Sequence, residues 1–311
     1  MIRNTERKNQ SLAQFIFAFS LITFSSQVVY GHGAHTTPAQ AISWGTWTVS
    51  WPVIITLILI SLYYLTGWKR VLRLNPNNTF KEWQLLFFIL GILTLVFSLL
   101  SPIDVLSDYL ASVHMIQHTL LLMVAAPFFA LASPGFYSFR QLPRYFKRGV
   151  QPFQKFWFRL TRPIPIKRMF VAWVFYAFIL WIWHVPVMYE AALQNSLIHD
   201  LQHLAFFISA YFFWRVIIDP FRQPKKNEGI AILYTFVASL HAMILGVLMT
   251  LAPNNWYPSY EETAPLFGFT ALEDQQLAGL IMWMPAGVSY VLVALLSLYK
   301  LINRHNQVVE G

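Results

Sequence analysis

Long apolar runs alternate with short polar stretches along most of this chain. Seven of the runs are close to the ~20 residues that an α-helix needs to cross a bilayer. We predict membrane-spanning helices at residues 48–66, 83–101, 113–133, 169–187, 199–218, 230–252 and 276–299. The predicted fold is therefore all-α, a polytopic membrane protein in which residues 32–311 form one domain with seven transmembrane helices.

The first 31 residues have the pattern of a secretory signal peptide. A basic start is followed by a short apolar core at 12–24 and by Gly31, a small residue of the kind found at cleavage sites. An uncleaved anchor helix is the alternative, although this apolar core is short for a span. Cleavage after Gly31 would make His32 the new N-terminus, with His35 close behind.

Composition agrees with a chain that lies mostly in lipid. Hydrophobic residues make up 57% of it and charged residues only 11%, whereas a soluble domain carries roughly 25% charged residues. There are no cysteines. Disulfides and thiolate-based zinc, iron–sulfur and copper sites are therefore excluded.

Positive charges gather in alternate connecting segments. Apart from Arg215, every Lys and Arg after the signal peptide lies in 67–82, 134–168, 219–229 or 300–311. Because Lys and Arg mark the cytoplasmic side of a membrane protein, this predicts that the N-terminus is outside and the C-terminus inside. The net charge of +9 is attributed to these loops, and no nucleic-acid partner is predicted.

The histidines follow the opposite distribution. His114 and His118 open the third predicted span, and His199 and His203 open the fifth. Residues four apart share one face of a helix, so each pair can hold one ion or share one ligand. The predicted orientation places both pairs near the outer surface, and two pairs at one depth favour a metal site over isolated polar residues.

Four further histidines are weaker candidates. His184 lies near the outer end of the fourth span, and His241 lies nearer the middle of the sixth. Each is a candidate ligand, but a single imidazole that caps a neighbouring carbonyl explains either one equally well. His32 and His35 are auxiliary candidates, better explained as part of a polar mature N-terminus.

Methionine thioethers and one carboxylate add to the predicted site. Met282 and Met284 lie near the outer end of the seventh span, and Met115 and Met123 accompany the first histidine pair. Thioether with imidazole suits copper, especially Cu(I), although methionine is also a common apolar filler. Asp274 is placed either to orient an imidazole by a hydrogen bond or to favour the start of a helix.

The chain resembles the CtaG-type assembly factors of caa3-type cytochrome c oxidases in four short blocks. They are HMIQH through AP at 114–127, WHVP at 183–186, HDLQH at 199–203 and DQQLAGLIMW at 274–283. The resemblance implies a bacterial inner-membrane protein, not an enzyme, that helps an oxidase mature by copper delivery. Its partners would be the lipid bilayer and the oxidase subunits, of which subunit II carries a copper centre on the outer side.

Two other functions remain open from the residues alone. A haem-binding membrane protein would use histidines from facing helices, but two axial ligands cannot both come from one helical turn. A transporter of copper or another ion would need a pathway, in which His241 is the one candidate near the midplane. Apart from Asp200 at the start of the fifth span, the spans lack carboxylates, which argues against proton-driven pumping. No catalytic arrangement is evident.

Overall fold

The computed structural model describes residues 43–74, 81–134, 165–218 and 228–309, and the regular secondary structure in these ranges is helical throughout. The predicted signal peptide, with His32 and His35, lies outside the described residues. Those predictions therefore stay predictions.

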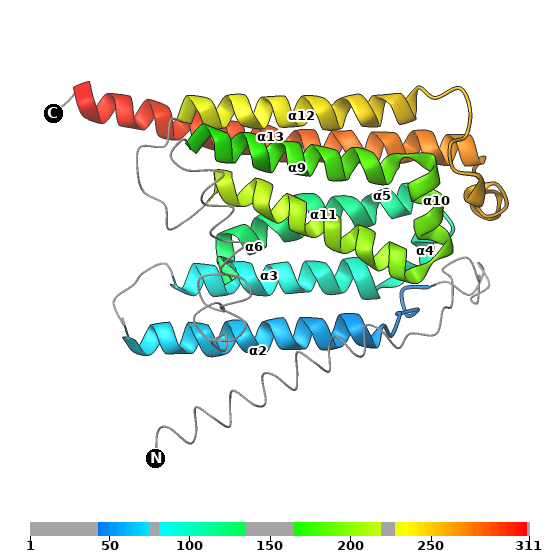
Figure 1. Cartoon of the computed structure of the whole chain (residues 1–311), viewed down its shortest axis with the longest axis horizontal. Helices are drawn as coiled ribbons and strands as arrows, with labels where there is room; N and C mark the ends of the chain where they lie inside the picture. Colours follow the sequence, from blue (N-terminus) through cyan, green and yellow to red (C-terminus); the bar gives the residue numbers. More distant parts are fainter. Residues whose placement is uncertain (1–42, 75–80, 135–164, 219–227, 310–311) are drawn as a thin grey trace, which may run out of the picture.

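The described chain forms a bundle of long helices with roughly parallel axes (Figure 1). They are α2 (Trp51–Leu74), α3 (Lys81–Leu100), α9 (Pro165–His184), α11 (Ser196–Ile217), α12 (Glu228–Thr250) and α13 (Ala271–Val309). One more long stretch consists of α5 (Ala111–Thr119), η2 (Leu120–Ala125) and α6 (Ala126–Ala132). Each of the seven predicted segments overlaps one of these stretches, although 169–187 runs past the end of α9 and 276–299 covers only part of α13.

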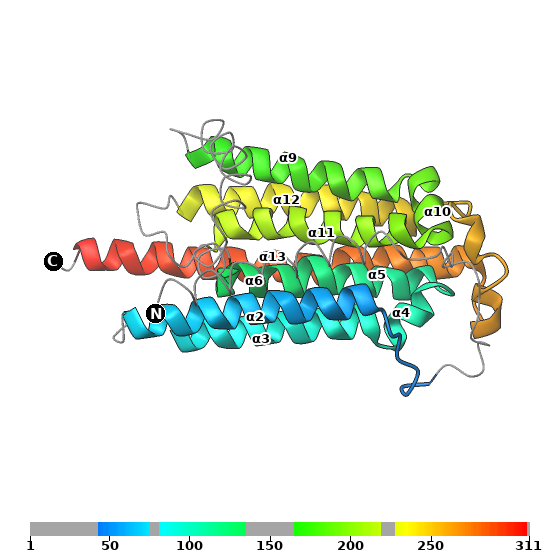
Figure 2. The same ribbon diagram turned by 60° about the horizontal axis from the view of Figure 1, so that its bottom comes forward.

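Short elements gather at one end of the bundle. These are α4 (Pro102–Ser107), α10 (Pro186–Gln194), η3 (Pro258–Tyr260) and η4 (Ala264–Phe267). Figure 2 shows them opposite the end at which the C-terminus lies. We call this the loop end of the bundle.

Among the described helices, five segments are long and apolar enough to cross a membrane, and a sixth results if the bent pair α9–α10 counts as one span. Helix α11 is not in this set. Its first turns carry the polar side chains of Asp200 and Gln202 together with two histidines, which lower its hydropathy. The structure thus supports a multi-pass membrane protein, while seven spans and their orientation stay predictions.

The bend between α9 and α10 is set by a proline. Pro186 begins α10, and Val185 before it is extended, with φ −62° and ψ 129°. A proline disfavours the helical conformation of the preceding residue. The chain therefore turns by 72°, and His184 is left at the bend.

The stretch from α5 to α6 is interrupted by the π-helical turns of η2. Pro127, two residues after the end of η2, has no N–H to donate to a carbonyl one turn earlier. The Trp214 Nε1–H of α11 donates instead to the Leu122 carbonyl, at 2.8 Å. This bond ties α11 to the widened part of the third segment, and such π-turns occur frequently at functional sites.

Helices α12 and α13 approach each other closely through glycine. A Cβ added at Gly279 would lie 2.6 Å from the Gly246 carbonyl oxygen, closer than packing allows. Small residues let helix backbones touch in membrane proteins. The position of α13 against α12 therefore depends on both glycines.

Candidate metal centre

Five imidazoles meet near the loop end of the bundle. They come from α5 (His114 and His118), α9 (His184) and α11 (His199 and His203). All five side chains are buried, and the most exposed of them is only 7% exposed. We call these five residues the histidine cluster.

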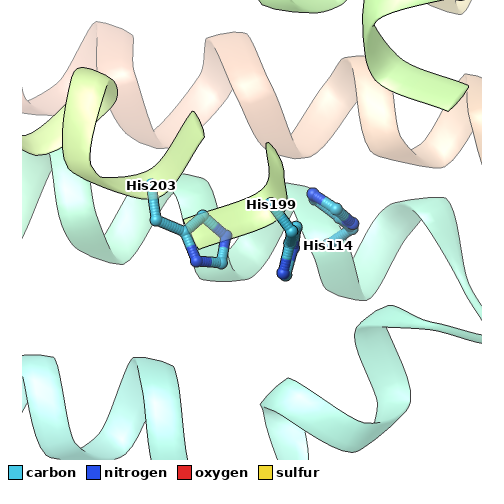
Figure 3. Close-up of side chains that lie close together, drawn as sticks. All are labelled: His114, His199 and His203. Carbon is cyan, nitrogen blue, oxygen red and sulfur yellow. The ribbon is translucent and has the colours of Figure 1, made fainter. Parts of the chain in front are cut away.

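Three members of the cluster can offer nitrogens to one point. Ring nitrogens of His114, His199 and His203 all lie within 4.8 Å of one another (Figure 3). Nitrogens that share one tetrahedral ion are roughly 3.4 Å apart, given metal–nitrogen bonds near 2 Å. Small side-chain rotations would therefore bring these three imidazoles onto one metal ion.

His118 lies between this triad and His184. Its ring centroid is 4.3 Å from that of His114, 5.4 Å from that of His203 and 6.3 Å from that of His184. Neither of its ring nitrogens makes a hydrogen bond within the described part of the chain. Leaving such groups buried without a partner costs roughly 1–3 kcal/mol, so a bound ion would satisfy what the protein does not.

His184 is held in the tautomer that a metal ligand needs. Its Nδ1 is 2.6 Å from the Leu180 carbonyl oxygen, and a carbonyl can only accept. Nδ1 therefore carries the proton, and Nε2 has the lone pair. Metal-binding histidines are commonly oriented by donating their other ring N–H to a carbonyl in this way.

Tyr260 orients His114 from the loop end. The Tyr260 hydroxyl donates to the Ser107 carbonyl oxygen at 3.1 Å and lies 3.2 Å from His114 Nδ1. With its proton committed to Ser107, the hydroxyl oxygen accepts from Nδ1–H, which leaves the lone pair on Nε2 of His114. Burial raises the pKa of Tyr260 well above its ordinary value, so the phenol stays protonated in this role.

Sequence reasoning missed Tyr260. It lies in η3, in a segment with no histidine, and its contact with His114 spans 146 positions of sequence. The only available signal was the aromatic content of that connecting segment, which did not distinguish this tyrosine from its neighbours.

Asp274 acts on a helix rather than directly on an imidazole. Its carboxylate accepts from the backbone N–H of Ala111 at 2.6 Å and of Ser112 at 3.1 Å. Leu110, the residue before α5, provides no side-chain cap, so Asp274 supplies the missing acceptor from α13. The first turn of α5, and with it His114, is therefore fixed by a charged group on another helix.

The structure places His241 among different partners. Trp173 Nε1–H donates to His241 Nδ1 at 3.3 Å, and the Tyr176 ring centroid lies 5.6 Å from that of His241. The two predicted auxiliary methionines also separate. Met282 is buried, whereas Met284 is 55% exposed, and so only Met282 is placed for a part in a site.

Comparison with known families decides what kind of protein carries this cluster. The family model described as "Cytochrome c oxidase caa3 assembly factor (Caa3_CtaG)" matches residues 62–304, which is most of the chain. This chain belongs to that family. The matched region runs from within α2 to near the end of α13 and contains the whole histidine cluster.

One curated relative is an uncharacterized protein of Mycobacterium leprae (strain TN). It is 26% identical over 246 residues, which cover 76% of this chain and 37% of the relative. The aligned part of this chain thus spans well under half the length of that protein, whose printed name says nothing about activity. No solved structure matches this chain.

Proposed function

We propose that this assembly factor binds copper at the histidine cluster and delivers it to a cytochrome c oxidase during assembly. The observation that carries the proposal is the set of three buried imidazoles whose nitrogens lie within 4.8 Å of one another. His118 and His184 extend this set as further ligands, and Tyr260 and Asp274 hold it in place. His241 is left out, because its ring lies beside Trp173 and Tyr176 and not among the cluster imidazoles.

Copper is favoured over other metals by the available donors together with the family. Imidazole suits zinc, copper, iron and nickel alike, whereas thioether selects Cu(I). The chain has no cysteine, so methionine supplies its softest donors, and buried methionines adjoin the cluster. A factor that serves a copper-containing oxidase has a use for this ion.

We also propose that the loop end faces the outer side of the membrane. The exposed acidic residues Glu261 and Glu262 lie in the segment at this end. Lys69, Arg70 and Arg73 lie toward the other end of α2. This distribution is the one expected when Lys and Arg mark the cytoplasmic side. In this orientation the loop end, near which the histidine cluster lies, would face an oxidase subunit that receives copper on the outer side.

The test combines metal analysis and an optical spectrum of the full chain purified in detergent. We expect copper in the wild type and its loss in the double variant His114→Ala/His203→Ala, which removes one ligand from each of two helices. In cells, the same variant should lower oxidase activity at an unchanged level of the assembly factor. Stoichiometric zinc without copper, or the visible absorbance of haem, would contradict the proposal.

A further inference from the structure

A second group of soft donors lies directly against the histidine cluster. A cavity of ≈ 20 Å³ has Met115, Met123 and Met282 in its lining, together with His118 and His184. That volume suffices for about one water-sized occupant. The three methionines come from α5, η2 and α13, so two stretches far apart in the sequence contribute to its lining.

These methionines are buried, as is Met249 outside the cavity (0% exposed), whereas two other methionines are exposed. Met115, Met123 and Met282 are 1%, 9% and 7% exposed, whereas Met243 and Met284 are 40% and 55% exposed. Methionine as a general apolar filler needs no such convergence on a space that also contains imidazoles.

The π-helical turns of η2 help to bring two of the thioethers together. On a regular α-helix, Met115 and Met123 would point roughly 80° apart, because eight residues at 3.6 per turn exceed two full turns. A π-turn has more residues per turn and therefore winds less per residue. The π-segment thus reduces this angular offset and turns Met123 toward the side of Met115.

The two imidazoles at the cavity have nitrogens available for an ion. Neither ring nitrogen of His118 makes a hydrogen bond among the described residues, and the same is true of His184 Nε2. His118 is 2% exposed and His184 is 3% exposed. His118 also packs against the triad, with its ring centroid 4.3 Å from that of His114, and so it faces both groups of donors.

We propose that this cavity is a second metal site, a thioether–imidazole pocket for Cu(I), formed by Met115, Met123 and Met282 with His118 and His184. The inference rests on the proposed copper function and assigns His118 and His184 to a second ion, which leaves the first ion to the triad. Thioether sulfur selects Cu(I) over Zn²⁺ and the oxygen-seeking ions. A buried apolar cavity also penalises a divalent ion more than a monovalent one, because the cost of desolvation rises steeply with charge. The chain thus offers an all-imidazole site beside a softer one.

The first experiment counts Cu(I) in the full chain purified in detergent, titrated without oxygen against a chromogenic Cu(I) chelator. We expect about two equivalents in the wild type, one for each group of donors. Met115→Leu/Met282→Leu should remove one equivalent, and His199→Ala/His203→Ala should remove the other. The control Met243→Leu/Met284→Leu should keep both, since these methionines are exposed. Exchange of Met for Leu conserves volume, so the fold is retained.

The second experiment examines wild-type protein by X-ray absorption at the copper edge. Sulfur scatterers are expected at one of the two ions, and Ag(I) should fill the same pocket whereas Zn²⁺ should not. This measurement uses only wild-type protein, so it tests the proposal even if Met115→Leu/Met282→Leu fails to fold.

The outcomes separate the two proposals. If only nitrogen ligands are found and the leucine variant binds copper as the wild type does, the thioether pocket is refuted while the histidine triad stands. If copper is lost from the leucine variant but not from the triad variant, the pocket stands and the proposed triad site is wrong. If the wild type binds no copper, both are refuted.

Discussion

The histidine cluster and His241 are two ways of burying imidazole within one helical bundle. His241 is paired with a tryptophan N–H at 3.3 Å and flanked by tyrosine. His118, in the cluster, makes no hydrogen bond through either ring nitrogen within the described part of the chain. The described protein therefore satisfies one ring nitrogen of His241, whose Nε2 has no hydrogen-bond partner there, but neither ring nitrogen of His118.

The helices that carry these residues also differ in how much of each is buried inside the protein. The span Ala111–Ala132, with His114 and His118, is 61% buried inside the structure, whereas Ile232–Thr250, with His241, is 33% buried. A central helix is surrounded by protein and can present polar groups inward at less cost than one that meets lipid. Burial of the whole helix thus separates a candidate site from a single structural histidine.

The sharpest test of the comparison sets His199→Ala/His203→Ala against His241→Ala. The first should weaken copper binding by more than the ~10–100-fold typical of losing an outer-shell partner, because two ligands are removed. The second should leave copper affinity nearly unchanged. It should cost about 1–3 kcal/mol of stability, since it removes the acceptor of Trp173. Competition titration measures copper affinity, and thermal unfolding measures stability. Loss of copper in His241→Ala would show that His241 also contributes to copper binding.

A smaller effect is expected from Tyr260→Phe. Removal of the hydroxyl lets His114 rotate and change tautomer, and we expect about a tenfold loss of copper affinity. Tyr257→Phe is the matched control, because the Tyr257 hydroxyl donates to the backbone carbonyl of His184 at 3.1 Å and not to an imidazole. Equal losses in the two variants would show that Tyr260 acts only through packing.

Asp274→Ala should act chiefly on stability. It leaves the N–H groups of Ala111 and Ser112 without their acceptor at the start of α5, where loss of a cap costs about 0.5–2 kcal/mol. We expect a lower unfolding temperature and a change in copper affinity below that of Tyr260→Phe. An unchanged unfolding temperature would argue against the capping role.

The weakest predicted effect is a loss of stability in alkaline solution. Burial raises the pKa of both Tyr257 and Tyr260 above the ordinary tyrosine value, which is about 10. The folded protein therefore holds these protons more tightly than the unfolded chain. Stability is full below pH ~10 and falls as the pH rises beyond it. Tyr260→Phe should flatten this dependence, as measured by unfolding temperature against pH, and an unchanged slope would be contrary to this origin.

Much of the helical layout follows from the sequence, because apolar runs near the bilayer thickness have few alternatives to helix. The histidine pairs were also visible, since their spacing is local. The residues that position these histidines could not be predicted from local sequence. Asp274 reaches Ala111 across 163 positions, and no local pattern indicates that a carboxylate on one helix caps another. The bend after His184 was not predicted, because the fourth span was placed at 169–187, through Pro186. The signal peptide, the orientation and the metal stay predictions.

Because of the π-helical turns between His118 and Pro127, the number of residues in this stretch sets how the residues beyond it are rotated about the helix axis. In a regular helix, each inserted or deleted residue rotates everything beyond it by about 100°. In η2 each residue rotates the chain by less than in an α-helix, so the π-turns accommodate extra residues with a smaller total rotation. A one-codon deletion at Leu120, Leu121 or Leu122 would therefore change the angle between the histidines of α5 and Met123 without removing any ligand. Among homologous chains, the count of residues from His118 to Pro127 should vary less than the identity of the residues between them.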